Sequence, residues 1–195
     1  MDNSPHTKNL EVCPPGLAWL LVNPLRRLLH DPDKILGGLG LEGLAVADLG
    51  CGPGYFSIPM GRLSGENGRV FAVDMEEEML GMVRRRAAAA GLAARIQTVL
   101  CSPREIGLED GSVDFALACW MVHEVADQEG FLRQVFKLLK PGGRFLLVEP
   151  IIHVSGADFN ETSGMAIAAG FELLSRPKVS ISHAALFGRG VALQL

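Results

Sequence analysis

The stretch VADLGCGPGYFSIPMGRL, residues 46–63, joins an apolar segment to a segment with helical spacing through a run of glycines. Asp48, Gly50, Gly52 and Gly54 occupy alternate positions in it. Glycine permits left-handed turns and lets a ligand approach the backbone closely. Open α/β sheets bind ligands beyond the carboxyl ends of their strands. The stretch therefore predicts a strand, a ligand-binding loop and a helix, in that order.

Strand-like and helix-like segments alternate along the chain from this stretch onward. Short apolar runs bounded by turn residues predict strands, at residues 44–49, 69–74, 95–101, 113–119, 144–149, 171–179 and 183–191. Helical spacing and terminal signals predict helices, at residues 55–63, 76–91, 128–140 and 158–170. Asp127 is expected to cap the third of these helices, and the PGG at residues 141–143 to end it.

This alternation predicts an α/β fold: a Rossmann-like, doubly wound sheet with helices on both faces. Its strands, about seven, are expected to be mostly parallel. Only a few residues join the last two strands, too few for a parallel crossover, so one strand must run in reverse. Residues 41–195 are expected to form this single domain.

Residues 1–40 lie outside the alternating pattern and are expected to form a helical lead-in. Within it, GLAWLLVNPLRRLL, residues 16–29, carries leucines at helical spacings, interrupted by Asn23 and Pro24. No long insertion follows the fifth strand that could roof the ligand site. We therefore predict that the lead-in covers the carboxyl edge of the sheet near Tyr55 and Trp120; packing on an outer face is the alternative.

Composition excludes several classes of function. The chain has 195 residues and a formal net charge of −4, and it lacks the basic surface or reading motif of a nucleic-acid-binding protein. The first residues do not resemble a signal peptide, and no apolar run is long enough to span a membrane. Four scattered cysteines without CxxC spacing predict neither a structural metal site nor a disulfide framework. A cytoplasmic protein is expected; the sequence does not indicate its oligomeric state.

The pattern of acids indicates which ligand the glycine loop takes. A dinucleotide site would need a third glycine where Tyr55 stands, and the carboxylate of Asp48 would repel a pyrophosphate. The same carboxylate suits a cationic amino group. Asp74, which ends the second predicted strand, suits the hydroxyls of a ribose. S-adenosylmethionine combines such a ribose with a cationic amino-acid end and lacks phosphate.

Four motifs make the chain resemble the class I S-adenosylmethionine-dependent methyltransferases. They are DLGCGPG, VFAVDMEEEML, SVDFALACWMVHEV and LLKPGGRFLLVEP, which together cover roughly residues 44–150. The resemblance implies a strand order of 3-2-1-4-5-7-6 with strand 7 antiparallel. It also implies methyl transfer to an acceptor, which we expect to be a small molecule.

The resemblance assigns cofactor contacts residue by residue. Gly50, Cys51 and Gly52 would line the methionine moiety, with Gly54 supporting the turn. Asp48 would hold the amino group, directly or through water, and Cys119 would offer it a backbone carbonyl. Asp74 would bind the ribose, and Met75 would lie against the adenine. The acid that the family often carries after strand three is missing from LCSPRE, so Ser102, or Glu105 reaching back, would contact the adenine instead.

The acceptor side is less specified by the sequence. Alignment of a nucleophile with the methyl group supplies much of the rate, and a base helps when the acceptor carries a proton. His123 is the candidate base, with Glu149 as a second candidate, and Tyr55, Trp120 and His153 are candidates for the pocket wall. Each could instead be an ordinary packing or loop residue.

Other functions stay open beside this one. They are modification of a protein or another macromolecule, a non-catalytic cofactor-binding module, and methylation of a metalloid through Cys51, Cys101 and Cys119. The cysteine pattern of arsenite methyltransferases is not reproduced, and buried cysteine is a common small core residue.

Overall fold

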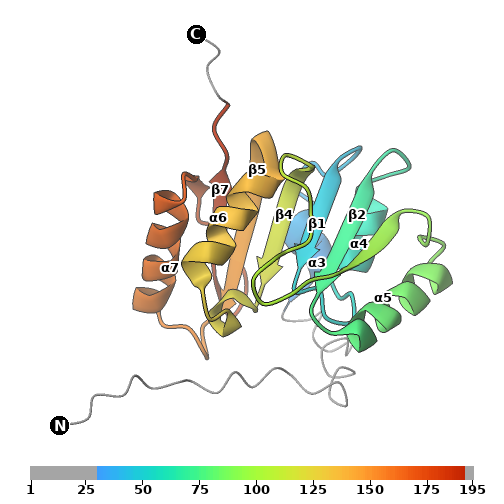
Figure 1. Ribbon diagram of the computed structural model, residues 1–195, viewed down its shortest axis with the longest axis horizontal. Coiled ribbons are helices and arrows are strands. Elements are labelled where there is room, and N and C mark those ends of the chain that lie inside the picture. Colours follow the sequence, from blue (N-terminus) through green and yellow to red (C-terminus); the bar gives the residue numbers. More distant parts are fainter. Residues whose placement is uncertain (1–29, 192–195) are drawn as a thin grey trace.

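The computed structural model of the protein describes residues 30–191. They form seven strands and five α-helices around one sheet (Figure 1). The strands are β1 (Ala45–Leu49), β2 (Arg69–Asp74), β3 (Ile96–Leu100), β4 (Val113–Cys119), β5 (Leu139–Pro150), β6 (Glu172–Ser175) and β7 (Ser182–Gly188). The helices are α3 (Pro32–Leu36), α4 (Ser57–Leu63), α5 (Glu77–Ala89), α6 (Gln128–Leu138) and α7 (Gly156–Ala168), with a 3-10 turn, η2 (Val122–Glu124).

The strand order is β3-β2-β1-β4-β5-β7-β6, as the resemblance implied. Strands β1 to β5 pair in parallel, and β7 pairs antiparallel with both β5 and β6. The reversed strand that the short final connection required is therefore β7. The predicted doubly wound α/β fold is confirmed.

The central strands are buried on both faces, and their side chains alternate between two cores. In β4, Phe115 and Leu117 belong to the core beneath α3, α4 and α5, whereas Ala116 and Ala118 belong to the core beneath α6 and α7. All four are fully buried. Because both faces need apolar side chains, these strands are continuous apolar runs in the sequence.

Several element boundaries differ from those that the sequence predicts: β6 ends at Ser175 and not at residue 179, and the starts of β5 and α7 have clear structural causes. Helix α6 ends at Leu138, but β5 begins at once and includes the PGG turn, where Gly142 has a φ of 80° and donates its N–H to the Arg189 carbonyl at 2.8 Å. The pairing of β4 with β5 is irregular there. Helix α7 begins earlier than expected because Ser155 and Asp158 form a capping box.

The described end of the lead-in is part of the fold. Leu36 of α3 is buried in the core beneath α4 and α5. Arg144 of β5 donates to the carbonyl of Leu39, which ties this segment to the sheet. Residues 1–29 lie outside the described residues, so the predicted lead-in domain and its boundary at residue 40 remain predictions.

Candidate cofactor and acceptor site

The glycine loop follows β1 at the carboxyl edge of the sheet. Gly50, Gly52 and Gly54 all have left-handed backbones, with φ values of 66°, 51° and 81°. A Cβ at Gly50 would lie 2.9 Å from Cγ of Met121, so this backbone also packs too closely for a side chain. Cys51 donates its N–H to the carbonyl of Val73 at 2.9 Å, which holds the loop against the end of β2. The alternating glycines are explained by backbone conformation and close packing together.

Asp74, the last residue of β2, is bound to this loop through both carboxylate oxygens. One oxygen accepts the N–H of Gly52 at 2.7 Å, and the other accepts the N–H of Glu76 at 3.0 Å. Each carboxylate oxygen can accept a second hydrogen bond. The carboxylate therefore fixes the loop and keeps acceptor capacity for a pair of hydroxyl groups.

Asp48 lies beneath the loop and not on its surface. Its side chain is 2% exposed, and it accepts a hydrogen bond from the hydroxyl of Ser57, the first residue of α4, at 2.6 Å. Burial first, then the charges of Asp48 and Asp74, raise the pKa of the Cys51 thiol well above its usual value. The negative charge of Asp48 therefore acts on the loop from beneath it.

Two of the three cysteines in the described residues, Cys51 and Cys101, have raised thiol pKa values and are therefore poor thiolates. Burial, followed by the charge of Asp74, raises the pKa of Cys101 to about 11. Thiolates, not thiols, bind soft metals and metalloids. Within residues 30–191, no cluster of three His, Cys, Asp or Glu side chains could hold a metal ion. Cys119, at the end of β4, is half-buried.

The expected adenine contacts lie beside Asp74. Met75, the next residue along the chain, is 46% exposed. The turn after β3 is closed by hydrogen bonds between the backbones of Ser102 and Glu105, and the Ser102 hydroxyl accepts the N–H of Arg104 at 3.3 Å. Both Ser102 and Glu105 are exposed at this edge.

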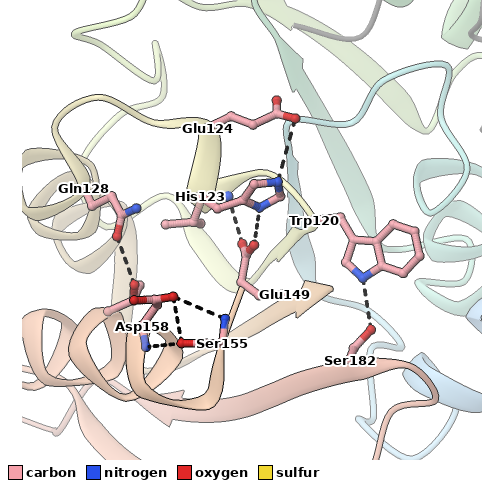
Figure 2. A network of polar contacts seen from close by, with 10 residues as sticks. Trp120, His123, Glu124, Gln128, Glu149, Ser155, Asp158 and Ser182 are labelled. Carbon is pink, nitrogen blue, oxygen red and sulfur yellow. Dashed lines mark hydrogen bonds and ion pairs between the residues drawn. The ribbon is translucent and has the colours of Figure 1, made fainter. Parts of the chain in front are cut away.

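His123 and Glu149, 26 residues apart, form a pair at the same edge (Figure 2). Glu149 is 2% exposed at the end of β5. One of its oxygens accepts the N–H of Val122 at 2.9 Å, and the other pairs with Nδ1 of His123. The carboxylate of Glu149 is therefore committed to η2, whereas the imidazole remains 24% exposed.

Charge interactions of Glu124 link this pair to Asp74. The hydrogen bond to Glu149 raises the pKa of His123, and partial burial opposes that rise. Nε2 of His123 lies 3.9 Å from a carboxylate oxygen of Glu124. Partial burial raises the pKa of Glu124, and the charges of Glu149 and Asp74 raise it further while His123 and His153 lower it. Glu124 thus lies within electrostatic reach of both Asp74 and the His123–Glu149 pair.

His153, in the turn after β5, stacks on His123 with ring centroids 5.8 Å apart and planes 11° apart. The structure therefore brings together His123, Glu149 and His153, the three acceptor-side candidates from the ends of β4 and β5. Glu124, which the sequence places beside His123, joins them.

Trp120 has a left-handed backbone, with a φ of 61°, which is rare for a bulky side chain. Its N–H donates to the carbonyl of Val148, and its indole donates to the hydroxyl of Ser182 at 3.0 Å. The ring of His30 stacks on the indole at 4.7 Å. Tyr55 donates its hydroxyl to the His30 carbonyl at 2.8 Å. Strained backbone held by such contacts is common at functional sites.

The comparison with known families is decisive at this point. The model of the methyltransferase domain family matches residues 47–147, from β1 into β5. The chain belongs to the class I S-adenosylmethionine-dependent methyltransferases. In this methyltransferase, the matched segment contains the glycine loop, Asp74 and the His123 turn.

Relatives of known sequence and structure agree with the family. The Ubiquinone/menaquinone biosynthesis C-methyltransferase UbiE of Klebsiella pneumoniae is 34% identical over 114 residues, which are 57% of this chain and 45% of that protein. The chain spans about half the length of the curated relatives it matches. A SAM-dependent methyltransferase from Aquifex aeolicus superposes with a TM-score of 0.82 at 25% identity, over 90% of this chain and 98% of that one. A Methanococcus maripaludis structure, at 17% identity, shares the fold over both whole chains with a TM-score of 0.76.

Sequence reasoning missed several residues of this methyltransferase site. Ser57 and Met121 were not singled out, although Met121 lies directly after Trp120 in one of the four motifs. His30 and Ser182 are far from the motifs in sequence, and only the fold brings them to Trp120. None of the helices in residues 30–191 has the length and hydrophobicity that crossing a bilayer requires.

Proposed function

We propose that this methyltransferase binds S-adenosylmethionine at the glycine loop and transfers its methyl group to a small-molecule acceptor. One observation carries the proposal: Asp74 of β2 holds the Gly52 N–H and thereby joins the ribose-binding position to the methionine-binding loop. S-adenosylmethionine, when bound, supplies an electrophilic methyl group on a sulfonium. Gly50, Cys51 and Gly52 would hold its methionine moiety, Asp74 its ribose, and Met75 its adenine.

The acceptor class is supported by the relatives and by the side chains at the edge. The curated relatives are named for C-methylation in ubiquinone and menaquinone biosynthesis, which makes a small acceptor the favoured class. The aromatic side chains of Tyr55 and Trp120 and the stacked pair His123–His153 would line the acceptor side. Raised thiol pKa values count against the metalloid alternative.

His123 is suited to accept a proton from the acceptor. When Nδ1 donates to Glu149, Nε2 carries the lone pair and acts as the base. An acceptor hydroxyl, or a ring carbon activated by a hydroxyl, must lose a proton during methylation, and a positioned base assists that loss. Glu149 touches His123 and the Val122 backbone, so it is a positioning residue in this proposal.

Calorimetry with S-adenosylmethionine and S-adenosylhomocysteine tests the cofactor site. We expect micromolar dissociation constants, roughly −7 to −8 kcal/mol. Asp74→Ala should weaken binding by about 1.5–3 kcal/mol, because it removes charge-assisted hydrogen bonds to the ribose and releases the Gly52 N–H. The fold should survive, because Asp74 is the last residue of its strand and is not a core residue.

Glu66→Ala is the matched control. It removes an exposed carboxylate from the turn before β2, at the opposite edge of the sheet, and should leave affinity unchanged. An Asp74→Ala variant with the wild-type dissociation constant would remove Asp74 from the site. Absence of heat with both ligands, beside a thermal shift with NAD, would refute the proposed cofactor. Cofactor binding without turnover of any small acceptor would favour a macromolecular acceptor or a binding module.

A further inference from the structure

A cavity of about 340 Å³ lies between α7 and the segment that joins β6 to β7. This volume lies in the range of small-molecule sites. The family motifs end before it, and none of the residues that line it belongs to the cofactor site. Its wall includes Phe159, Asn160, Arg176, Lys178, Ser182 and His183.

The cavity is cationic and partly apolar. Arg176 and Lys178 supply two full positive charges, and no carboxylate is among the described residues that line the wall. In the part of the chain that the structure describes, neither cation forms an ion pair within 4.0 Å. Gly156, the first residue of the 13-residue helix α7, also lines the cavity, so the positive end of that helix dipole faces the same space.

Aromatic contacts hold Arg176 and His183 in place. The guanidinium of Arg176 lies over the ring of Phe159, 5.7 Å from its centroid. The imidazole of His183 stacks on the same ring at 5.3 Å. Phe159 itself is 2% exposed and anchored in the core beneath α6 and α7. An arginine positioned on a buried ring loses less freedom on binding an anion than an arginine on a free loop.

The cavity adjoins the acceptor side of the site. Ser182 lines it and accepts the hydrogen bond from the Trp120 indole. His183 is paired across the sheet with Glu149, the residue that positions His123. Directly opposed residues of antiparallel strands have Cα atoms about 4.5–5.5 Å apart. Figure 2 shows the Trp120–Ser182 contact beside the His123–Glu149 pair.

We infer that this cavity binds the carboxylate of the acceptor, so that the acceptor is a small organic acid with an apolar body. The inference rests on the proposed function, because it places the acid group beside the acceptor side of that site. Arg176 and Lys178 bind the carboxylate, which matches the fork geometry of arginine. Pro177 and Val179, which also line the cavity, pack against the apolar body. The reacting end of the acceptor then extends past Ser182 toward His123.

The test uses the full chain and two probes, benzoate and 3-phenylpropionate, each beside its uncharged amide. Binding is measured by calorimetry and by the histidine ring signals in nuclear magnetic resonance spectra. We expect the wild-type protein to bind at least one acid, with a shift of the His183 signals, and to bind its amide at least tenfold more weakly. Arg176→Gln and Lys178→Gln should each weaken binding of the acid on the order of tenfold.

Arg85→Gln is the matched control, since Arg85 is exposed on α5 beneath the other face of the sheet. It should leave binding of the acid unchanged. All three variants should keep the wild-type melting temperature and the wild-type affinity for S-adenosylmethionine. That second affinity separates the two proposals. A wild-type protein that does not bind S-adenosylmethionine would refute the proposed function, whereas a wild-type protein that binds S-adenosylmethionine but neither acid would refute this inference alone.

Three outcomes would overturn the inference. The first is the absence of binding of either acid by the wild-type protein. The second is acid binding that survives both substitutions or is matched by the amide. The third is displacement of the acid by equimolar inorganic phosphate, which would assign the cavity to phosphate and not to an organic carboxylate.

Discussion

Glu149 determines how His123 can act. The carboxylate is buried, and both of its oxygens are engaged by η2, one through Val122 and one through His123. A charged acceptor at Nδ1 stabilises the imidazolium, which is why the pKa of His123 is raised. As a base, His123 must be neutral, so the rate of methyl transfer should fall as the pH drops through this raised pKa.

Glu149→Gln should move that acidic limb to lower pH. The hydrogen bond from Nδ1 to Glu149 is the largest cause of the rise in the pKa of His123, and the charge of Glu149 adds to it. The amide keeps an oxygen for Nδ1, but the hydrogen bond is no longer made to a charged group and the added charge is gone. Rates should be measured across pH with S-adenosylmethionine saturating. The variant should also lose about 1–3 kcal/mol of unfolding free energy. The side-chain NH2 group of the glutamine would face the buried N–H of Val122, and two donors cannot form a hydrogen bond.

The free energy of unfolding changes with pH in the opposite direction to the rate of methyl transfer. A histidine with a raised folded-state pKa contributes stability that is fully present below its unfolded pKa of about 6.5 and is lost as the pH rises through the folded value. Glu149→Gln should flatten this dependence in thermal melts. Glu129→Gln, which changes an exposed carboxylate paired with Arg133 on α6, is the control and should alter neither profile. An unmoved limb in Glu149→Gln would show that His123 is not the titrating base.

The glycine loop is the element that carries cofactor binding. Gly50→Ala should abolish measurable S-adenosylmethionine binding, because its φ of 66° strains a side chain and its new Cβ would meet Met121 at 2.9 Å. Gly164→Ala is the matched substitution, since nothing lies within 4 Å of a Cβ placed there in the middle of α7. It should stabilise the protein by roughly 0.5–1 kcal/mol and leave binding intact. Calorimetry and thermal melts on both variants check this, and wild-type affinity in Gly50→Ala would contradict it.

The lead-in is the second element with a testable role. The described chain begins at His30, which stacks on Trp120 and accepts a hydrogen bond from Tyr55. This contact is the basis of the prediction that residues 1–29 cover the carboxyl edge of the sheet. We expect deletion of residues 1–29 to leave a folded domain that binds cofactor and exposes Trp120 to solvent.

Fluorescence quenching measures this exposure directly. The deletion removes Trp19, so Trp120 becomes the only tryptophan. The undeleted Trp19→Phe variant also has Trp120 as its only tryptophan and is therefore the reference. The quenching constant with acrylamide should be larger in the deleted protein than in Trp19→Phe. Deletion of residues 1–12 in the Trp19→Phe background keeps the leucine-rich segment and should quench like Trp19→Phe alone. Equal quenching in all three proteins would mean that residues 1–29 do not cover Trp120.

At the scale of the whole molecule, one sheet separates two cores that share every central strand. Phe115 lies in one core and Phe145 in the other, and both are fully buried on neighbouring strands. Phe145→Ala and Phe115→Ala should each cost about 3–5 kcal/mol of unfolding free energy. Because the cores are joined through the sheet, each variant should unfold in one transition by circular dichroism. Two separate transitions would show that the faces unfold independently.

Local patterns in the sequence were sufficient for much of this fold. The bounds of β2 and β4 were predicted to the residue, because both strands are short, mainly apolar runs bounded by turn residues. The glycine loop and Asp74 were recognised because a left-handed loop and a strand-terminal acid leave signals within a few residues. The start of β5 was not predicted, since PGG normally ends regular structure. Here Leu139 already pairs with Val113 of β4, and Gly142 and Gly143 exchange backbone hydrogen bonds with Arg189.

By itself, the sequence determined the α/β alternation, the reversed final strand, the glycine loop and the acid at Asp74. Only the tertiary structure decided that Glu149 positions His123, that His30 stacks on Trp120, and that Arg176 lies over Phe159 beside the acceptor side. The physical reason is range. Backbone conformation and apolar periodicity act between near neighbours, whereas side chains tens of residues apart meet only after parallel strands have aligned their carboxyl ends along one edge.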